Sequence, residues 1–312
     1  MKDKNNQKSI AKVLILCMGL IIALASCGIK EASAPSDQEK PETTSKVEEQ
    51  AHETEEQAQE VEEQEAEEPE EQDVEPQASG DDDSGVLTGD ELYMAVYMKA
   101  TEEPLTENDI ANIDGFFQSY TISYDDPVYS RITGKSYQDN TNIGLDSLRY
   151  LRIPHYDFNH EVRLGEMIVN VGIADSALAI FRTLFDNEYE INSIRLIDDF
   201  WAGDGLSSDD ASIAANNTSA FCYREIAGGT GLSNHAYGRA IDVNPYQNPY
   251  YRVVNGEPTD LFEWDWDYLD RESGKPHMIL RGDICQATFA AYGFTWGGDW
   301  ADPVDYQHFE LP

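Results

Sequence analysis

Cysteine is scarce in this sequence of 312 residues, which contains only 4 of them. Cys17 and Cys27 fall within the first 30 residues, so only Cys222 and Cys285 remain for the rest of the chain. Two cysteines cannot provide the disulfide framework on which small secreted domains depend. We expect Cys222 and Cys285 to be buried thiols that act as small apolar side chains. A single bridge between them is the alternative.

Basic residues are also few. The chain has 21 Lys and Arg against 60 Asp and Glu, for a formal net charge of −39. Residues 31–83 contain 22 acidic and 2 basic residues, while residues 84–312 contain 37 acidic and 14 basic residues. Nucleic-acid recognition depends on clustered Lys and Arg, so the composition argues against a nucleic-acid partner. A cationic partner is compatible with this charge.

The sequence lacks an apolar run of the about 20 residues that a membrane-spanning helix needs. A shorter run covers residues 13–25 and follows Lys2, Lys4, Lys8 and Lys12, which is typical of a signal peptide. The run ends in Leu24-Ala-Ser-Cys27, which resembles the bacterial lipobox. That resemblance implies that Cys27 is lipidated and anchors the protein to the cell membrane, outside the cytoplasm and facing the cell wall. An ordinary secretory leader is the alternative.

Residues 28–86 are rich in Glu, Gln, Ala, Ser and Pro and have almost no aromatic residues. Such a segment cannot bury enough apolar surface to offset the entropy lost on ordering. Repulsion between its carboxylates would extend it. We therefore predict a disordered acidic linker between the anchor and the folded part.

Residues 87–147 contain two stretches with helical apolar spacing, Thr88–Lys99 and Asn108–Tyr120. We predict a small, mostly helical accessory segment that packs on the following domain. A separate wall-binding module is the alternative for this region.

Residues 148–312 contain several short apolar runs and one amphipathic helical stretch. The predicted elements are strands at residues 150–154, 165–170 and 194–197, and a helix at residues 173–189. This order predicts an α+β fold, an antiparallel sheet with flanking helices. Trp264 and Trp266 lie in an acidic stretch at 260–272 that we expect to form a loop at the rim of a cleft.

His235, Asp242 and His308 form a candidate metal-ligand set. Two histidines and one carboxylate leave a coordination position open, as catalytic zinc sites do. Asp242 lies between Ile241 and Val243 and should be buried, and a buried charge needs a partner or a metal. We therefore predict one Zn²⁺ per chain. A buried salt bridge from Asp242 to Arg239 is the alternative.

Asp305 precedes His308 by three residues, so both side chains can face the same way in a turn. We predict that Asp305 is the general base, which takes a proton from water and passes it to the leaving amine. Glu310 and Asp299 are the reserve candidates. Ser233 lacks the Gly-x-Ser-x-Gly context of a nucleophile. The other histidines lack a comparable context and are expected to be structural: His155, His160 and His277.

The pattern Ser-x-His-x-x-Gly-x-Ala-x-Asp at residues 233–242, followed by Asp305-x-x-His308, resembles the VanY-type zinc D-alanyl-D-alanine carboxypeptidases and L-alanyl-D-glutamate endopeptidases. The resemblance includes Gly293–Trp300 and Asn216–Phe221 and extends from about residue 148 to the end of the sequence. It implies the same α+β fold and activity on the stem peptides of peptidoglycan.

The resemblance also implies further site residues. Arg224 matches an upstream arginine that binds a substrate carboxylate or orients the carbonyl; Arg239, or a surface role for Arg224, is the alternative. Ser219 and Ser233 are expected to bind substrate. Carboxypeptidases of the family usually have Glu at the position of Asp305, so the shorter side chain favours the endopeptidase-like branch.

The leading hypothesis is therefore a monomeric zinc peptidase that cuts peptidoglycan stem peptides. A catalytically silent zinc module that recognises wall peptides or a protein partner is the alternative, although such a module has no need for Asp305. A lipoprotein adhesin is a third hypothesis, and it leaves the three-ligand set unexplained.

Overall fold

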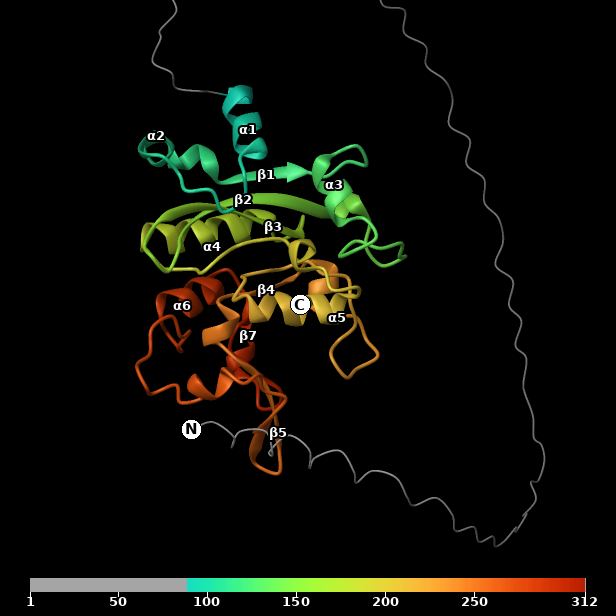
Figure 1. Cartoon of the computed structure of the whole chain (residues 1–312), viewed down its shortest axis with the longest axis vertical. Helices are drawn as coiled ribbons and strands as arrows, with labels where there is room; N and C mark the ends of the chain where they lie inside the picture. Colours follow the sequence, from blue (N-terminus) through green and yellow to red (C-terminus); the bar gives the residue numbers. More distant parts are fainter. Residues whose placement is uncertain (1–88, 312) are drawn as a thin grey trace, which may run out of the picture. The chain divides into compact units, whose positions relative to one another are not determined.

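The computed structural model describes residues 89–311 (Figure 1). The predicted signal peptide, the lipid anchor on Cys27 and the acidic linker lie outside the described residues. Across residues 89–311, every helix is too short or too polar to cross a bilayer.

A three-stranded antiparallel sheet contains the two longest strands, β2 (Leu148–Tyr156) and β3 (Val162–Asn170). β1 (Gln118–Thr121) pairs with the outer edge of β2. Both predicted strands in this region are confirmed; β2 extends beyond both predicted ends, and β3 begins three residues earlier than predicted and ends at the predicted residue. β2 is buried on both faces because Leu151 and Ile153 pack into one apolar cluster while Leu148 and Tyr150 pack into another.

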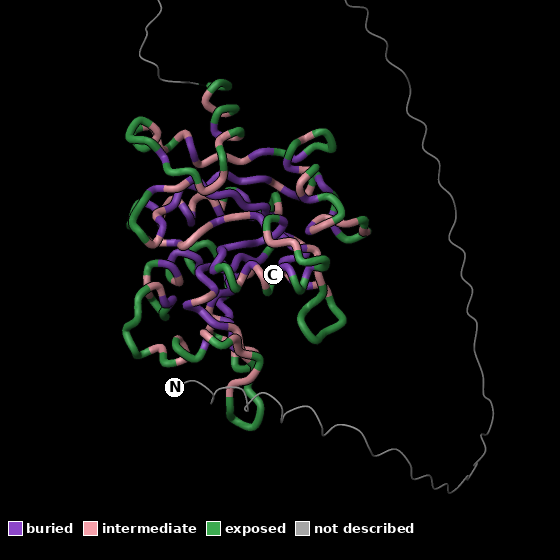
Figure 2. The backbone as a smooth tube through the Cα atoms, viewed as in Figure 1, coloured by how far each residue is buried: buried purple, intermediate pink, exposed green. Residues whose placement is uncertain are grey.

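Helix α4 (Ala174–Asp186) covers one face of this sheet. Its buried residues recur every three or four positions, including Ala177, Ile180, Phe181 and Leu184, as expected for an amphipathic helix. The helix predicted at residues 173–189 is therefore confirmed. Figure 2 shows the buried backbone concentrated in the sheet and in the segments packed beneath it.

The N-terminal part of the described chain lies against the other face of the sheet. It contains α1 (Gly89–Met98), α2 (Glu107–Ala111) and α3 (Pro127–Ile132), and α1 and α3 contribute to the second apolar cluster. The helix predicted at Thr88–Lys99 is confirmed as α1. This region also supplies β1 to the sheet. The domain boundary after residue 147 stays a prediction.

Two predicted elements are wrong. Residues 108–120 do not form one helix, because α2 ends at Ala111, a 3-10 turn follows at Ile113–Phe116, and β1 begins at Gln118. Residues 194–197 do not form a strand. The side-chain amide of Asn217 accepts from the backbone N–H of Arg195 at 2.9 Å and donates to its carbonyl at 3.0 Å. Those are the backbone groups that a neighbouring strand would otherwise bind.

Two smaller antiparallel sheets complete the fold, and they confirm the α+β class with flanking helices. One has the order β4 (Ala240–Asp242), β9 (His308–Glu310) and β7 (Thr295–Trp296). The other has the order β6 (Glu257–Thr259), β5 (Tyr250–Val254) and β8 (Val304–Asp305). Helices α5 (Gly205–Ala214) and α6 (Ile284–Ala291) flank them.

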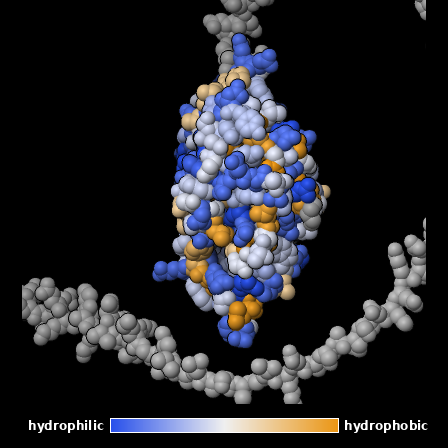
Figure 3. All heavy atoms as spheres, turned by 90° about the vertical axis from the view of Figure 1, so that its right-hand side faces the viewer, coloured by the Kyte–Doolittle hydropathy of each residue, from blue (hydrophilic) through white to orange (hydrophobic). Residues whose placement is uncertain are grey.

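Cys222 and Cys285 are both buried and unpaired, which confirms the prediction of two thiols. Figure 3 shows one face of the molecule, on which hydrophilic side chains predominate and hydrophobic ones form small scattered groups.

Candidate active site

The register between β4 and β9 brings two of the predicted ligands together. Asp242 lies directly opposite His308, and Ile241 lies opposite Phe309. Because successive side chains of a strand point to opposite faces, Ile241 and Phe309 enter the core while Asp242 and His308 face the other way. The apolar residues that fill the core therefore also orient the two polar ones.

His235 comes from a 3-10 turn, Asn234–Tyr237, immediately before β4. The hydroxyl of Ser233 caps this turn and accepts from the backbone N–H of His235 at 3.3 Å. Gly238 ends the turn with φ +64°, and a Cβ there would lie 2.7 Å from the backbone nitrogen of Asn170 on β3. Only glycine combines this backbone conformation with so close an approach to a strand. The turn is thereby fixed against the large sheet.

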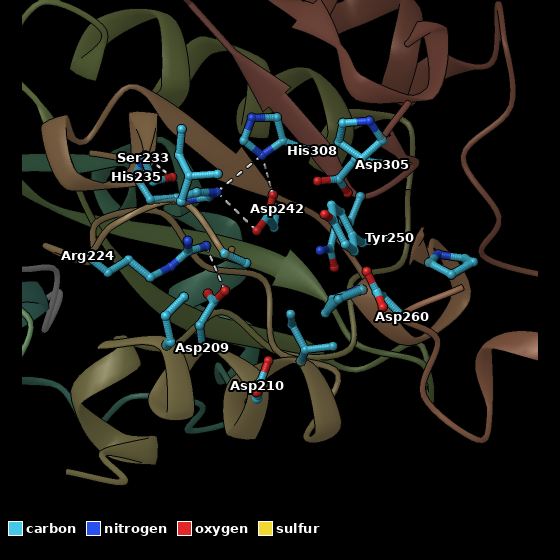
Figure 4. A pocket seen from close by; sticks show the side chains of 18 of the residues that line it. Asp209, Asp210, Arg224, Ser233, His235, Asp242, Tyr250, Asp260, Asp305 and His308 are labelled. Carbon is cyan, nitrogen blue, oxygen red and sulfur yellow. Dashed lines mark hydrogen bonds and ion pairs between the residues drawn. The ribbon is translucent and has the colours of Figure 1, made fainter. Parts of the chain in front are cut away.

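The side chains of His235, Asp242 and His308 converge on one point (Figure 4). His235 Nε2 lies 3.2 Å from Asp242 Oδ2, and His308 Nδ1 lies 3.0 Å from Asp242 Oδ1. The two imidazole nitrogens are 3.2 Å apart. A tetrahedral zinc centre with bonds of about 2.0–2.1 Å separates its ligand atoms by about 3.3 Å. The spacing therefore fits a single metal ion.

The outer nitrogens of both imidazoles are held by acceptors. His235 Nδ1 donates to the carbonyl oxygen of Ala220 at 2.6 Å, which leaves the lone pair on Nε2. His308 Nε2 donates to Glu310 at 3.0 Å, and the same carboxylate accepts from Asn234 at 2.7 Å. Such outer hydrogen bonds fix the tautomer and ring orientation of metal-binding histidines. Two lone pairs and a carboxylate thus face one another, which is a binding site for a cation.

Electrostatics agree with this geometry. Burial alone would lower the pKa of His308, but the bonds to Asp242 and Glu310 outweigh it and raise that pKa to about 10. Burial would likewise raise the pKa of Asp242, yet the two histidines hold it well below its usual value. This position therefore favours a positive charge next to an ionised carboxylate, whether the charge is a proton or a metal cation.

Asp305 lines the same pocket from β8, where it pairs with Tyr250 of β5. Its side chain is buried, and its Oδ1 atom has no hydrogen-bond partner within residues 89–311. Burial raises the pKa of its carboxyl to about 8, although the neighbouring His308 opposes the rise. The backbone is fixed by Gly297, where a Cβ would lie 2.5 Å from the Asp305 carbonyl oxygen. The predicted base is therefore a buried carboxyl group aimed into the pocket.

Arg224 also lines the pocket, where its Nη2 atom lies 2.7 Å from Asp209 Oδ2 on α5 (Figure 4). Burial would lower the pKa of this guanidinium, but Asp209 outweighs burial and raises it. Arg239, the alternative, is exposed. Ser233 lines the pocket, whereas Ser219 does not appear among the described residues that line it. Ser219 instead pairs through its backbone with Asp242, at 3.1 and 2.9 Å.

The remaining candidates lie in other surroundings. Asp299 forms an ion pair with Arg281, and Glu310 is bound to His308. Three histidines lie apart from the ligand set. His155 lies 3.4 Å from Glu102, His160 lies 3.2 Å from Glu190, and His277 stacks on Phe158.

The pocket has a volume of about 640 Å³ and includes residues that the sequence analysis missed. These are Asp209, Asp210, Tyr250, Asp260, Trp300 and Gln307. They come from segments far apart in the chain. Trp300 ends the run Gly293–Trp300 and Gln307 lies within Asp305-x-x-His308, but neither pattern by itself assigns a role to these two residues. The loop predicted at 260–272 does reach the rim of the pocket, but through Asp260, Phe262 and Asp265. Trp264 instead stacks between Tyr246 and Phe262.

Comparison with known proteins agrees with this arrangement. Residues 227–311 match the family model described as D-alanyl-D-alanine carboxypeptidase. The matched range contains the three candidate ligands and Asp305, whereas Arg224 lies just before it. No solved structure matches the chain. The match covers about a quarter of the chain and supports a D-alanyl-D-alanine carboxypeptidase-like peptidase fold for residues 227–311.

Proposed function

We propose that the protein is a zinc-dependent peptidase that hydrolyses peptide bonds in peptidoglycan stem peptides, as a D-alanyl-D-alanine carboxypeptidase or an L-alanyl-D-glutamate endopeptidase. One observation carries the proposal. Candidate ligand atoms of His235, Asp242 and His308 lie 3.0–3.2 Å apart, and the other ring nitrogen of each histidine is already hydrogen-bonded. The same pocket holds the buried carboxyl of Asp305. A silent binding module would have no use for that carboxyl.

His235, Asp242 and His308 would hold the metal, and Ala220 and Glu310 would orient the two imidazoles. A bound zinc ion supplies a Lewis acid that polarises the substrate carbonyl and makes water more acidic. The protein contributes the fixed geometry, because its ligands lie on a strand pair and a capped turn.

Asp305 would accept the proton of the attacking water and deliver it to the leaving amine. Its unpartnered Oδ1 atom leaves it free to bind that water. Arg224 would orient the substrate carbonyl or bind a substrate carboxylate, and Asp209 holds the guanidinium in place at 2.7 Å. Stem peptides as the substrate, and lipidation of Cys27 as the means of keeping the enzyme beside the wall, are parts of the same proposal.

To test this function, the purified full chain is loaded with zinc and incubated with muropeptides of defined sequence. The products are identified by mass. Loss of a single D-alanine indicates a carboxypeptidase, and a break between L-Ala and D-Glu indicates an endopeptidase. Protein treated with a chelator and then reloaded with zinc is the control. Stoichiometric zinc without any cleavage would favour the silent binding module instead.

A further inference from the structure

Gln307 is a buried polar residue that the proposed mechanism does not use. It lies between Asp305 and His308 in the sequence, lines the same pocket, and is 4% exposed. Its side-chain Oε1 atom is buried without a hydrogen-bond partner within residues 89–311. Its backbone is fixed, because its carbonyl oxygen accepts from the N–H of Val243 at 3.0 Å, just after β4.

A buried acceptor without a partner costs free energy, so native proteins rarely leave one unbound. Two further polar atoms among the pocket residues lack partners, Asp305 Oδ1 and Arg224 Nε. Both belong to side chains that act on the substrate in the proposed mechanism. Gln307 Oε1 is the third pocket atom without a hydrogen-bond partner, and by the same reasoning the substrate would supply its donor.

We propose that Gln307 is a substrate-binding residue whose side-chain amide hydrogen-bonds a backbone peptide group of the substrate, next to the bond that is cut. The proposal rests on the proposed peptidase function. A side-chain amide carries one acceptor and one NH₂ donor, which complement the N–H and C=O of a peptide group. The amide is uncharged, and a charged chain end would lose more hydration on entering such a buried position than a neutral peptide group does.

The charges around the pocket point the same way. Two guanidinium groups line it, and each is already paired: Arg224 with Asp209 at 2.7 Å, and Arg252 with Asp302 at 3.6 Å. Both guanidinium groups among the described pocket residues are thus engaged by carboxylates, and of the two only Arg224 has a proposed role toward a substrate carbonyl or carboxylate. A neutral peptide group is the better match for the amide.

The test combines Gln307→Met, which keeps the length of the side chain but removes the amide, with modified substrates. In these substrates one amide N–H near the scissile bond at a time is replaced by an ester oxygen. On the unmodified muropeptide, kcat/KM should fall about tenfold, the effect of one hydrogen bond. That loss should disappear on the one analogue that lacks the N–H bound by Gln307, because the two changes remove the same interaction.

Gln247→Met is the matched control. Gln247 is also buried, and its Oε1 also lacks a partner within the described residues, but it does not line the pocket. Its replacement should leave kcat/KM unchanged on every substrate. Zinc content and the unfolding midpoint should stay at the wild-type level in Gln307→Met. If that variant does not fold, Gln307→Leu replaces it.

An unchanged kcat/KM in the Gln307 variant would overturn the proposal, since an ordered water would then satisfy the amide. An equal loss on all analogues would also overturn it, because Gln307 would then act through packing. If the wild-type protein cleaves no muropeptide, the proposed function fails separately. In that case the Kd of the uncleaved peptides is measured for the zinc-loaded wild-type protein and for the zinc-loaded Gln307 variant. If the peptides do not bind, or if the two proteins bind them equally well, the role of Gln307 is overturned.

Discussion

Asp242 and His308 face each other across the β4–β9 pair, with Oδ1 and Nδ1 3.0 Å apart. Their neighbours Ile241 and Phe309 are both fully buried and hold this register. A slip by one residue would turn His308 toward the core and Phe309 toward the site. The candidate metal site thus depends on the same strand pairing as the core.

Replacing any of the three ligands should sharply reduce zinc binding. His235→Ala, Asp242→Ala and His308→Ala each remove one of only three protein ligands. Zinc content of the purified variants, measured after dialysis against a weak chelator, should fall well below one ion per chain. The matched control is His277→Ala, because His277 stacks on Phe158 away from the ligands. Full zinc content in all three ligand variants would contradict the assignment.

Gly238→Ala should destabilise the protein. Its φ of +64° is strained for alanine, and the added Cβ would approach the backbone nitrogen of Asn170 to 2.7 Å. Strain of this kind typically costs about 1–3 kcal/mol, and the clash with a strand adds to it. Gly256→Ala is the matched control, since Gly256 has φ +86° but open space around its Cβ position. Urea unfolding should show the larger loss for Gly238→Ala; equal losses would mean that the contact with β3 does not matter.

Much of this site could be predicted because its signals are local. Asp242 ends a short strand and lies between two apolar residues, and His235 lies in a turn that Gly238 ends. Alternation and helical spacing likewise predicted β2, β3 and α4. These patterns depend on which face of an element is buried, which neighbouring residues already determine.

The elements that failed depend on distant residues. The segment Ile194–Ile197 has the composition of a strand, but the side chain of Asn217 takes the backbone groups of Arg195. The pocket residues Asp209, Asp260 and Gln307 come together only through the tertiary fold. Gln307 lies within the Asp305-x-x-His308 pattern and Asp260 in the predicted rim loop, but nothing near Asp209 in the sequence indicates that it shares their cavity.

Asp209→Ala should lower both stability and activity by releasing Arg224. The two side chains are about 12% and 11% exposed, and removing one partner of a buried ion pair typically costs about 3–5 kcal/mol. For the effect on stability, the matched control is Asp210→Ala on the same helix, because Asp210 is exposed. If Asp209 acts through Arg224, kcat/KM of the double variant Asp209→Ala/Arg224→Ala should fall no further than that of Arg224→Ala. Additive losses would show that the two residues act independently.

Cys27→Ala should abolish the proposed membrane anchoring, because Leu24-Ala-Ser-Cys27 resembles a lipobox and the cysteine of a lipobox carries the lipid. The expected result is loss of the protein from the membrane fraction, or retention of an uncut leader, because one or more acyl chains supply the affinity for the bilayer. Cys17→Ala is the matched control, since Cys17 lies inside the apolar run. A Cys27→Ala protein that is normally processed and still fractionates with membranes would exclude a lipid anchor.

Asp305→Asn should keep the metal and the fold but lose turnover. The amide has the size of the carboxyl group but cannot accept the proton, and general-base catalysis typically contributes ~10²–10⁴-fold to the rate. We expect kcat on a muropeptide to fall in that range, with zinc content and unfolding midpoint unchanged. Asp305→Glu keeps the carboxyl group and should retain measurable activity, with any loss caused by the displaced carboxylate.

Asp299→Asn is the matched control for Asp305→Asn, because Asp299 is engaged by Arg281 and does not line the pocket. Its kcat should equal that of the wild-type protein. A near wild-type rate in Asp305→Asn with zinc intact would transfer the role of base to Glu310, the reserve candidate that lines the pocket. Loss of zinc in Asp305→Asn would instead make Asp305 a fourth ligand. The open coordination position, on which the peptidase proposal depends, would then be closed.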